Sequence, residues 1–202
     1  MSLVLIRTNY LLLNTRLSTF AMPQFDDIWF TYKARIAAEV RLRNNDLHSQ
    51  VLLIWYAVLS TAGSIVAIRH EKFLGPNTDI SMAVLSVGLL AISMIVASRD
   101  FKGRALMMRA NHLALKTLFD ELKAGTVPAT EKPPRYAKLL QECENHTSYD
   151  DRHFRILNST GLTSRKPLVA DYFLFRLHLS LRVVGVGVVY LLPLGLAFGW
   201  QR

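Results

Sequence analysis

Three stretches of the chain carry no Asp, Glu, Lys, Arg or His, and each is long enough to cross a bilayer. They are Val51–Ile68, Ile80–Ser98 and Val183–Trp200, which contain 18, 19 and 18 residues. A transmembrane helix needs about 20 mostly apolar residues to span about 30 Å of hydrocarbon. A buried helix of a soluble protein rarely stays uncharged over such a length. The pattern therefore predicts three membrane spans, the first two joined as a hairpin.

A helical apolar stripe precedes the first span. Ile28, Tyr32, Ile36 and Val40 recur every four residues, and charged side chains occupy much of the remaining surface. No Pro or Gly occurs between residues 27 and 63, so this helix is expected to run directly into the first span. We interpret the stripe as a surface that packs on other helices; the alternative is contact with anionic lipid headgroups.

A second stripe follows the second span and has heptad spacing. Its members alternate in steps of four and three residues: Phe101, Ala105, Met108, His112, Leu115, Phe119 and Leu122. This coiled-coil seam is too short to be autonomous, so it needs a partner helix from the same chain or from another copy. We interpret His112 as a partly buried, hydrogen-bonded side chain, with a pH- or ligand-sensitive role as the alternative.

The segment Gly125–Pro134 is expected to end this helix, because Gly favours helix ends and Pro cannot continue a helix. The residues after it, Arg135–Leu157, are predicted to form one helix. Its apolar side consists of Tyr136, Leu139, Leu140 and Cys143. A polar loop, Asn158–Lys166, then leads to the third span. Aromatic residues expected at the membrane interface are Trp29, Tyr172, Phe173, Phe175 and Trp200.

Together these elements predict an all-α membrane protein. A transmembrane hairpin (51–98) is flanked by cytoplasmic amphipathic helices at 25–50 and within 99–178, and 179–200 forms a third transmembrane helix. Residues 1–24 form an N-terminal extension with three open interpretations. It is a weak targeting sequence, an interfacial peptide, or an upstream extension with Met22 as the true start.

Charge placement predicts the topology. The 202-residue chain has 24 Lys and Arg against 15 Asp and Glu, which gives a net charge of +9. Six of these cations lie in 1–50 and fifteen in 99–182, before and after the hairpin. Lys and Arg are enriched on cytoplasmic flanks, so both regions are expected in the cytoplasm. This placement explains the basicity, and without a nucleic-acid-binding motif we expect no direct nucleic-acid partner.

The chain shows no GxSxG element, P-loop or dinucleotide-binding glycine pattern. One local cluster has chemical interest: Glu142, His146 and Asp150 are four residues apart and can bond to one another on a helix. The cluster has no HExxH pattern or recurring ligand pair, so a metal site is not expected. Cys143 is the single cysteine, which excludes an intramolecular disulfide. We expect no enzyme activity and no cofactor.

Two groups of residues form recognisable motifs. The first comprises Ile28–Arg35, Glu39–Arg43 and Leu52–Tyr56, and the second extends from Tyr136 to Asp150. These motifs and the order of the helices resemble the SLATT family of bacterial conflict-system effectors over about residues 25–200. The motif residues that we single out are Trp29, Tyr32, Tyr136, Asn145, His146 and Asp150.

The resemblance implies a pore-forming or membrane-disrupting effector of antiviral defence and abortive infection. Such effectors are paired with a sensor protein or with an enzyme that makes a nucleotide second messenger; activated, they form homo-oligomers and depolarise the inner membrane. Small and hydroxyl residues in the first two spans suit helix contacts or a weakly polar pore. They are Ser60, Gly63, Ser64, Ser81, Ser86, Gly88 and Ser93. The alternative is that they only permit tight packing of a silent hairpin.

Cations near the base of the hairpin are the candidate contacts for an activating anion or a partner protein. They are Arg41, Arg43, Lys102, Arg104 and Arg109. The alternative role for these residues is to anchor the cytoplasmic side. Among other functions, a proton-coupled multidrug transporter is disfavoured because no span carries a carboxylate. A non-conducting membrane anchor or scaffold that recruits a partner is the alternative function.

Overall fold

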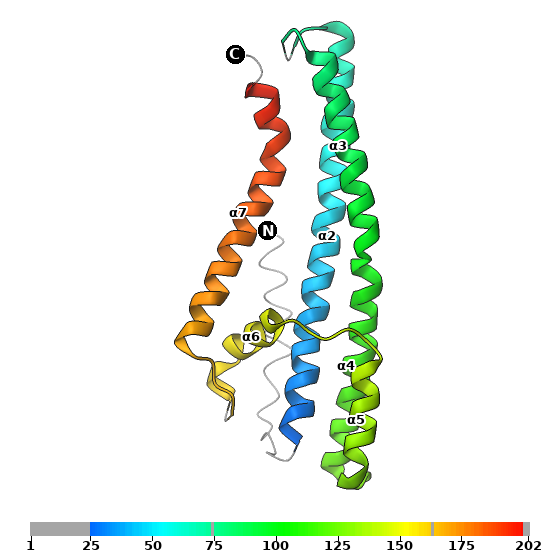
Figure 1. Cartoon of the computed structure of the whole chain (residues 1–202), viewed down its shortest axis with the longest axis vertical. Helices are drawn as coiled ribbons and strands as arrows, with labels where there is room; N and C mark the ends of the chain where they lie inside the picture. The colour runs from blue at the N-terminus through cyan, green and yellow to red at the C-terminus, as the bar shows by residue number, and fades with distance from the viewer. Residues whose placement is uncertain (1–24, 74, 163, 200–202) are drawn as a thin grey trace.

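A computed structural model describes residues 25–73, 75–162 and 164–199, and every regular element in these ranges is helical (Figure 1). In chain order they are α2 (Asp26–Arg69), α3 (Thr78–Arg99), α4 (Phe101–Ala124), η2 (Ala129–Glu131), α5 (Lys132–Gln141), α6 (Ser148–Leu157), η3 (Ser159–Gly161) and α7 (Val169–Gly199). Three helical stretches, namely α2, α3 with α4, and α7, are long and apolar enough to cross a membrane. The protein is an all-α membrane protein, as the uncharged stretches predicted. The expectations for residues 1–24 and for Trp200 lie outside the described residues.

A single helix, α2, connects the amphipathic stripe to the first span over 44 residues. At about 1.5 Å per residue it is about 66 Å long, roughly twice the thickness of the hydrocarbon layer. Residues up to Leu42 are largely buried against other helices, whereas most of Val51–Ile68 is exposed. The predicted continuity of this helix is confirmed, because nothing in its sequence forces a break before the turn at residues 70–77.

The helices α3 and α4 follow each other with one residue between them. That residue, Asp100, adopts a left-handed conformation (φ 39°) and its carboxylate Oδ1 accepts a hydrogen bond of 3.0 Å from the Gly103 amide. A Cβ atom at position 103 would lie within 3 Å of the Asp100 carboxylate, so a larger residue there would displace this capping side chain. As a result the second span continues almost directly into the heptad helix (Figure 1).

The first half of α2 packs with α4, α5 and α6 in a unit that we call the polar bundle. The heptad seam of α4 faces α2 of the same chain, which settles the choice between an internal partner and another copy. Two core clusters result: Phe25, Ile28, Tyr32, Leu115, Leu118, Phe119, Leu122 and Val127 in one, and Ala38, Leu42, Ala105 and Met108 in the other. Seam positions Ala105, Met108, Leu115, Phe119 and Leu122 are all buried.

The opposite face of α2 receives α6 and the residues after it. Phe30, Phe154 and Leu162 form a third core cluster there, against which Trp29 packs. The Trp29 ring lies edge-on to Phe30, with ring centroids 5.0 Å apart, and 5.4 Å from Phe154. The expected role of Trp29 as a membrane-interface anchor is therefore wrong. Its indole fills the polar bundle in the first turn of α2, far along the helix from the span.

The expected single helix at Arg135–Leu157 is instead two helices, α5 and α6, separated by residues 142–147. A capping box causes the break. The Thr147 hydroxyl accepts from the Asp150 amide, and the Asp150 carboxylate accepts from the Thr147 amide, which starts a new helix at Ser148. The preceding linker is also shorter than expected. Pro133 and Pro134 lie in the first turn of α5, where Pro is favoured because the first amides have no helical partner.

The last helix, α7, has 31 residues and begins at Val169, ten residues before the third segment as we delimited it. It runs along the length of the first span of α2 (Figure 1), and two α2 side chains bond to its backbone carbonyls. The Trp55 indole donates to the Tyr190 carbonyl at 3.1 Å, and the Tyr56 hydroxyl donates to the Val189 carbonyl at 2.9 Å. Phe175, expected as an interface anchor, stacks instead on Tyr149 of α6 at 5.7 Å between ring centroids. Side chains thus link both α2 and α6 to α7.

Candidate functional site

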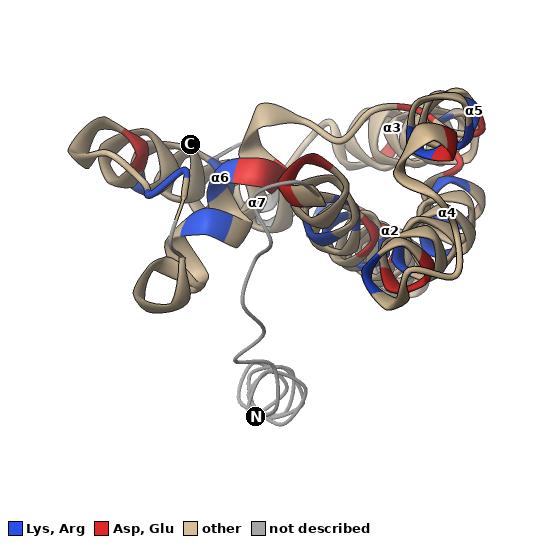
Figure 2. Cartoon of the chain, turned by 90° about the horizontal axis from the view of Figure 1, so that it is seen from below, with Lys and Arg blue, Asp and Glu red and all other residues tan. Residues whose placement is uncertain are grey.

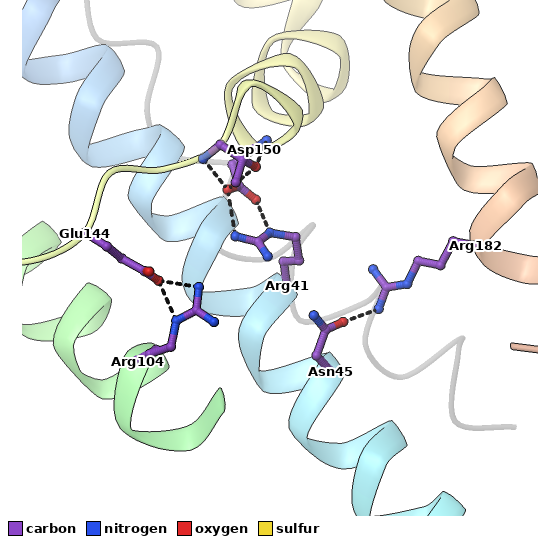
Figure 3. Close-up of polar contacts among 7 residues, drawn as sticks. Arg41, Asn45, Arg104, Glu144, Asp150 and Arg182 are labelled. Carbon is purple, nitrogen blue, oxygen red and sulfur yellow. Dashed lines mark hydrogen bonds and ion pairs between the residues drawn. The ribbon is translucent and has the colours of Figure 1, made fainter. Parts of the chain in front are cut away.

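The polar contacts of the bundle centre on a buried carboxylate at the start of α6. Asp150 is fully buried, and its two oxygens accept from Arg41 of α2, from Nε at 2.7 Å and from Nη2 at 3.1 Å (Figure 3). The same carboxylate accepts from the Thr147 amide at 2.8 Å and from the Thr147 hydroxyl at 2.7 Å. One side chain therefore caps α6 and holds it to α2 by a bidentate ion pair.

Two further contacts surround this ion pair (Figure 3). Arg104 near the start of α4 pairs with Glu144 of the α5–α6 connection at 2.8 Å. On the other side, Arg182 of α7 donates to the Asn45 side-chain oxygen of α2 at 2.7 Å. At the base of the hairpin, arginine side chains thus join α2 to α6 and α7 to α2. They also join α4 to the residues between α5 and α6.

A buried guanidinium lies deeper in the bundle. Arg35 of α2 is fully buried, and its Nη1 donates to the side-chain oxygen of Asn111 on α4 and, at 3.3 Å, to the Leu139 carbonyl of α5. Asn111 donates to the same carbonyl at 2.7 Å. Within the described residues, Nε and Nη2 of Arg35 have no hydrogen-bond partner. Burying a charge among neutral groups costs free energy of folding. The burial of Arg35 therefore depends strongly on its hydrogen bond to Asn111.

The histidine of the heptad seam is hydrogen-bonded, as interpreted from its position. His112 Nε2 lies 2.8 Å from Glu39 Oε2, and Glu39 also pairs with Arg43 at 3.3 Å. Both the His112 and the Glu39 side chains are largely buried. This pair joins α4 to α2 one turn beyond the Arg35 site.

The proposed activating cations do not form one open cluster. Arg41, Arg43 and Arg104 are engaged in the ion pairs described above, with Asp150, Glu39 and Glu144 as their partners. Lys102 and Arg109 are exposed on α4. Figure 2 shows Lys and Arg residues interspersed with Asp and Glu on the helices of the polar bundle. Internal pairing therefore uses much of the positive charge at the hairpin base.

Four of the six motif residues take part in the contacts between α2 and the later helices: Trp29, Tyr32, Tyr136 and Asp150. Tyr32 is buried, and burial together with the Asp120 carboxylate raises its pKa to about 12. The Tyr136 hydroxyl lies 2.7 Å from the Thr31 hydroxyl, which joins α5 to α2. Asn145 is exposed in the connection before α6.

His146 does not bond to Glu142 or Asp150 as helical spacing suggested, because these residues do not share a helix. Its ring is partly buried, and Nδ1 has no hydrogen-bond partner among the described residues. Burial lowers the pKa of His146, although the nearby Asp151 carboxylate acts in the opposite direction. No group of three His, Cys, Asp or Glu in the described part of the chain is placed to hold a metal ion.

The hydroxyl residues of the spans bond to their own helices. Ser64 donates to the Ser60 carbonyl at 2.9 Å, and Ser81, Ser86 and Ser93 likewise donate to carbonyls three or four residues earlier. The apolar surface of α3 is largely exposed; Val87 and Met94, for example, are each 66% exposed. A surface of this kind requires lipid or another protein copy around it.

The glycines within the two hairpin helices, Gly63 of α2 and Gly88 of α3, differ in their surroundings. A Cβ atom at Gly63 would lie 2.9 Å from the Met82 side chain, so this glycine permits close contact between α2 and α3. A Cβ atom at Gly88 would meet nothing within 4 Å. Gly63 thus serves packing inside the hairpin, whereas Gly88 faces away from its neighbours in the chain.

One feature of the bundle escaped the sequence analysis. A cavity of about 350 Å³ lies between α2, α4 and the segment from α6 through η3. Its lining includes three lysines and several aromatic rings, among them Lys33, Lys116, Lys123, Trp29 and Phe119. The sequence gives one weak indication of this cavity: Lys116 and Lys123 are seven residues apart and so lie on one side of a helix.

Comparison with known proteins identifies the family. The family described as SMODS and SLOG-associating 2TM effector domain family 5 matches residues 18–199. The chain belongs to this SLATT family. The hairpin of α2 and α3 supplies two transmembrane helices, and α7 is a further candidate span within the matched region. Neither the comparison with curated proteins nor that with solved structures returned a match.

Proposed function

We propose that this SLATT protein acts in a conflict system as a membrane effector that forms a homo-oligomeric pore or disrupts the cell inner membrane. A partner sensor, or the nucleotide messenger that it makes, triggers assembly, and the infected cell stops growing or dies. The role is non-enzymatic, and the polar bundle lies in the cytoplasm. Family membership supports the effector role, and the cations before and after the hairpin support the orientation.

The exposed surface of α3 is the observation that carries the pore proposal. Its side chains pack little against the rest of the chain, and Gly88 has open space where a second helix can approach. Small residues permit such close approach between helices in a bilayer. Hydroxyls of Ser86 and Ser93, satisfied by their own helix in a single copy, can line a weakly polar path when several copies assemble.

A glycine substitution tests this proposal in cells. We expect co-expression of the effector with its trigger to depolarise the membrane, read with a voltage-sensitive dye. Gly88→Leu fills the approach site of α3 and is expected to reduce depolarisation at least fivefold without lowering the amount of protein in the membrane. Val87→Leu, at the adjacent exposed position on a different side of the helix, is the matched control and is expected to act as the unchanged protein.

A normal membrane potential in triggered cells that hold the unchanged protein, together with recruitment of a partner protein to the membrane, contradicts the pore. It establishes the scaffold function instead. Equal depolarisation by the Gly88→Leu and Val87→Leu variants would show that α3 does not form the contact between copies.

A further inference from the structure

We propose that the cavity between α2, α4 and the α6–η3 segment binds a nucleotide, with its phosphate on the lysines and its base against the aromatic residues. The proposal deepens the function above, on which it rests, by giving the trigger a place in the chain. The residues that carry it are Trp29, Tyr32, Lys33, Lys116, Phe119 and Lys123, which all line the cavity. They come from the two central helices of the polar bundle.

The charges of the cavity are unbalanced. Lys116 pairs with Asp120 at 2.5 Å, and Asp120 is the only carboxylate among the described residues that line the cavity. Lys33 makes no ion pair within the described residues, and its ammonium lies 5.8 Å from the centroid of the Trp29 ring and 5.4 Å from that of Tyr32. Burial and the neighbouring Lys116 ammonium lower the pKa of Lys33. A bound anion relieves this repulsion, because it places negative charge between ammonium groups that now repel each other.

The aromatic side chains supply the second half of a nucleotide site. Trp29 is half-buried and lines the cavity, so its ring is the surface on which a base can stack. Tyr32 and Phe119 are buried, with ring centroids 5.9 Å apart, and contribute apolar wall to the cavity. Bases stack on aromatic rings with about 1–3 kcal/mol per base and little sequence preference. The volume of about 350 Å³ lies near the lower end of ligand pockets, which range over about 300–1,000 Å³, and suits one nucleotide.

The position of the cavity favours a soluble phosphate over a lipid headgroup. Lys33 precedes the uncharged span, which begins at Val51, by 18 residues of continuous helix. At about 1.5 Å per residue this is about 27 Å along α2. The headgroup layer is about 5–8 Å deep on each side of the hydrocarbon. A phospholipid in the bilayer therefore does not reach these lysines, whereas a free nucleotide does.

The same position explains how a ligand can act on the spans. The cavity joins the α2–α4 pair to α6, and α6 is tied to the start of α7 by two ion pairs of Asp171, with Arg152 at 3.1 Å and with Arg155 at 3.2 Å. A nucleotide bound here contacts both sides of this junction. It changes the free energy of docking α6 and α7 onto α2, and so the surface that the spans present to other copies.

Binding is tested on the full-length protein in detergent with TNP-ATP, a fluorescent nucleotide, and with ATP, adenosine and inorganic phosphate as competitors. We expect saturable TNP-ATP binding that ATP displaces at least tenfold better than adenosine or phosphate alone. Lys33→Gln with Lys116→Gln is expected to weaken binding at least tenfold. Lys116→Gln with Lys123→Gln changes two exposed positions of α4 and provides the same test should the first variant fail to fold.

The matched control is Lys72→Gln with Lys138→Gln, which removes two exposed lysine charges outside the cavity and is expected to leave binding within twofold. Absence of TNP-ATP binding, or equal binding by the cavity and control variants, overturns the nucleotide site. Because the assay needs neither membrane nor trigger, its failure leaves the pore proposal standing. Normal binding in a protein that never depolarises cells overturns the pore and leaves the site.

Discussion

At the scale of single residues, the polar bundle depends on arginine side chains that reach across helices. Asp150 receives Arg41 from α2 while it caps α6, and Arg35 is buried between α2, α4 and α5 with Asn111 as its side-chain partner. Removing one partner of a buried pair leaves the other charge uncompensated, and this costs more than the pair contributes. The positions with the largest effect on stability are therefore polar, although the core between them is apolar.

Asp150→Asn is expected to destabilise the polar bundle by about 2–3 kcal/mol, because Arg41 loses its anion and the α6 cap is weakened. The measurement is the melting temperature of the protein in detergent. Asp151→Asn is the matched control: it removes a neighbouring carboxylate that pairs with Arg155 within the same helix turn, a contact worth about 0.3–0.5 kcal/mol. Melting temperatures that fall equally for the two variants would show that Asp150 does not hold α6 to α2.

At the scale of helices, α6 connects the central pair to α7 in addition to the direct bonds between α2 and α7. It contacts α2 through Arg41 and Phe154 and contacts α7 through its ion pairs with Asp171 and an aromatic cluster. In that cluster His153 stacks on Phe175 at 5.4 Å, and Tyr149 lies 4.4 Å from the His178 ring. Because α6 has only ten residues, it depends on these contacts more than on its own helix propensity.

Acidification is expected to weaken the docking of α6. Burial lowers the pKa of His153, against the opposing effect of Asp150, and burial also lowers the pKa of His146. In the unfolded chain both histidines protonate near pH 6.5. As the pH falls below about 6.5, these histidines bind protons in the unfolded state but remain neutral in the folded state. The free energy of unfolding therefore decreases. The stability that these two neutral histidines preserve is fully present above this pH.

The melting temperature in detergent, measured from pH 7.5 to pH 5.5, tests this expectation. We expect it to fall by roughly 2–4 °C for each 1 kcal/mol lost. His153→Phe keeps an aromatic ring at the stack and is expected to flatten the pH dependence, whereas His70→Gln, at an exposed position in the hairpin turn, is expected to leave it unchanged. A melting temperature that rises on acidification would contradict the burial of neutral histidines.

At the scale of the whole molecule, a hairpin rod made of α2 with α3 and α4 carries the polar bundle at one end and the turn at residues 70–77 at the other (Figure 1). The cations before and after the hairpin lie at the bundle end, and this arrangement underlies the proposed cytoplasmic orientation. The exposed apolar surfaces of α3 and α7 lie between these ends, where lipid or another copy covers them.

Cysteine labelling tests the orientation of the rod. In a Cys143→Ser background, Lys72→Cys places a thiol in the exposed turn and Lys102→Cys places one at the exposed start of α4. A maleimide that cannot cross the membrane is expected to label intact cells at position 72 at least tenfold more than at position 102. Both positions are expected to react after lysis. The reverse ratio in intact cells would invert the proposed topology.

Several features follow from local sequence because their physics is local. Length without charge determines which segments enter a bilayer, so the three uncharged stretches identified the spans before any fold was known. Absence of Pro and Gly determines helix continuity, which holds for α2. The Thr147 to Asp150 capping box was equally readable, yet apolar periodicity through Arg135–Leu157 concealed it, and the break between α5 and α6 was missed.

What only the tertiary structure decided is which distant residues meet. The seam of α4 specifies a partner helix of matching shape, but the chain path makes that partner α2. Arg41 and Asp150 are 109 positions apart, and the lysines of the cavity come from two helices, so no local pattern joins them. Hydrophobic length and helix propensity are properties of consecutive residues, whereas ion pairs and cavities arise from the three-dimensional path of the chain.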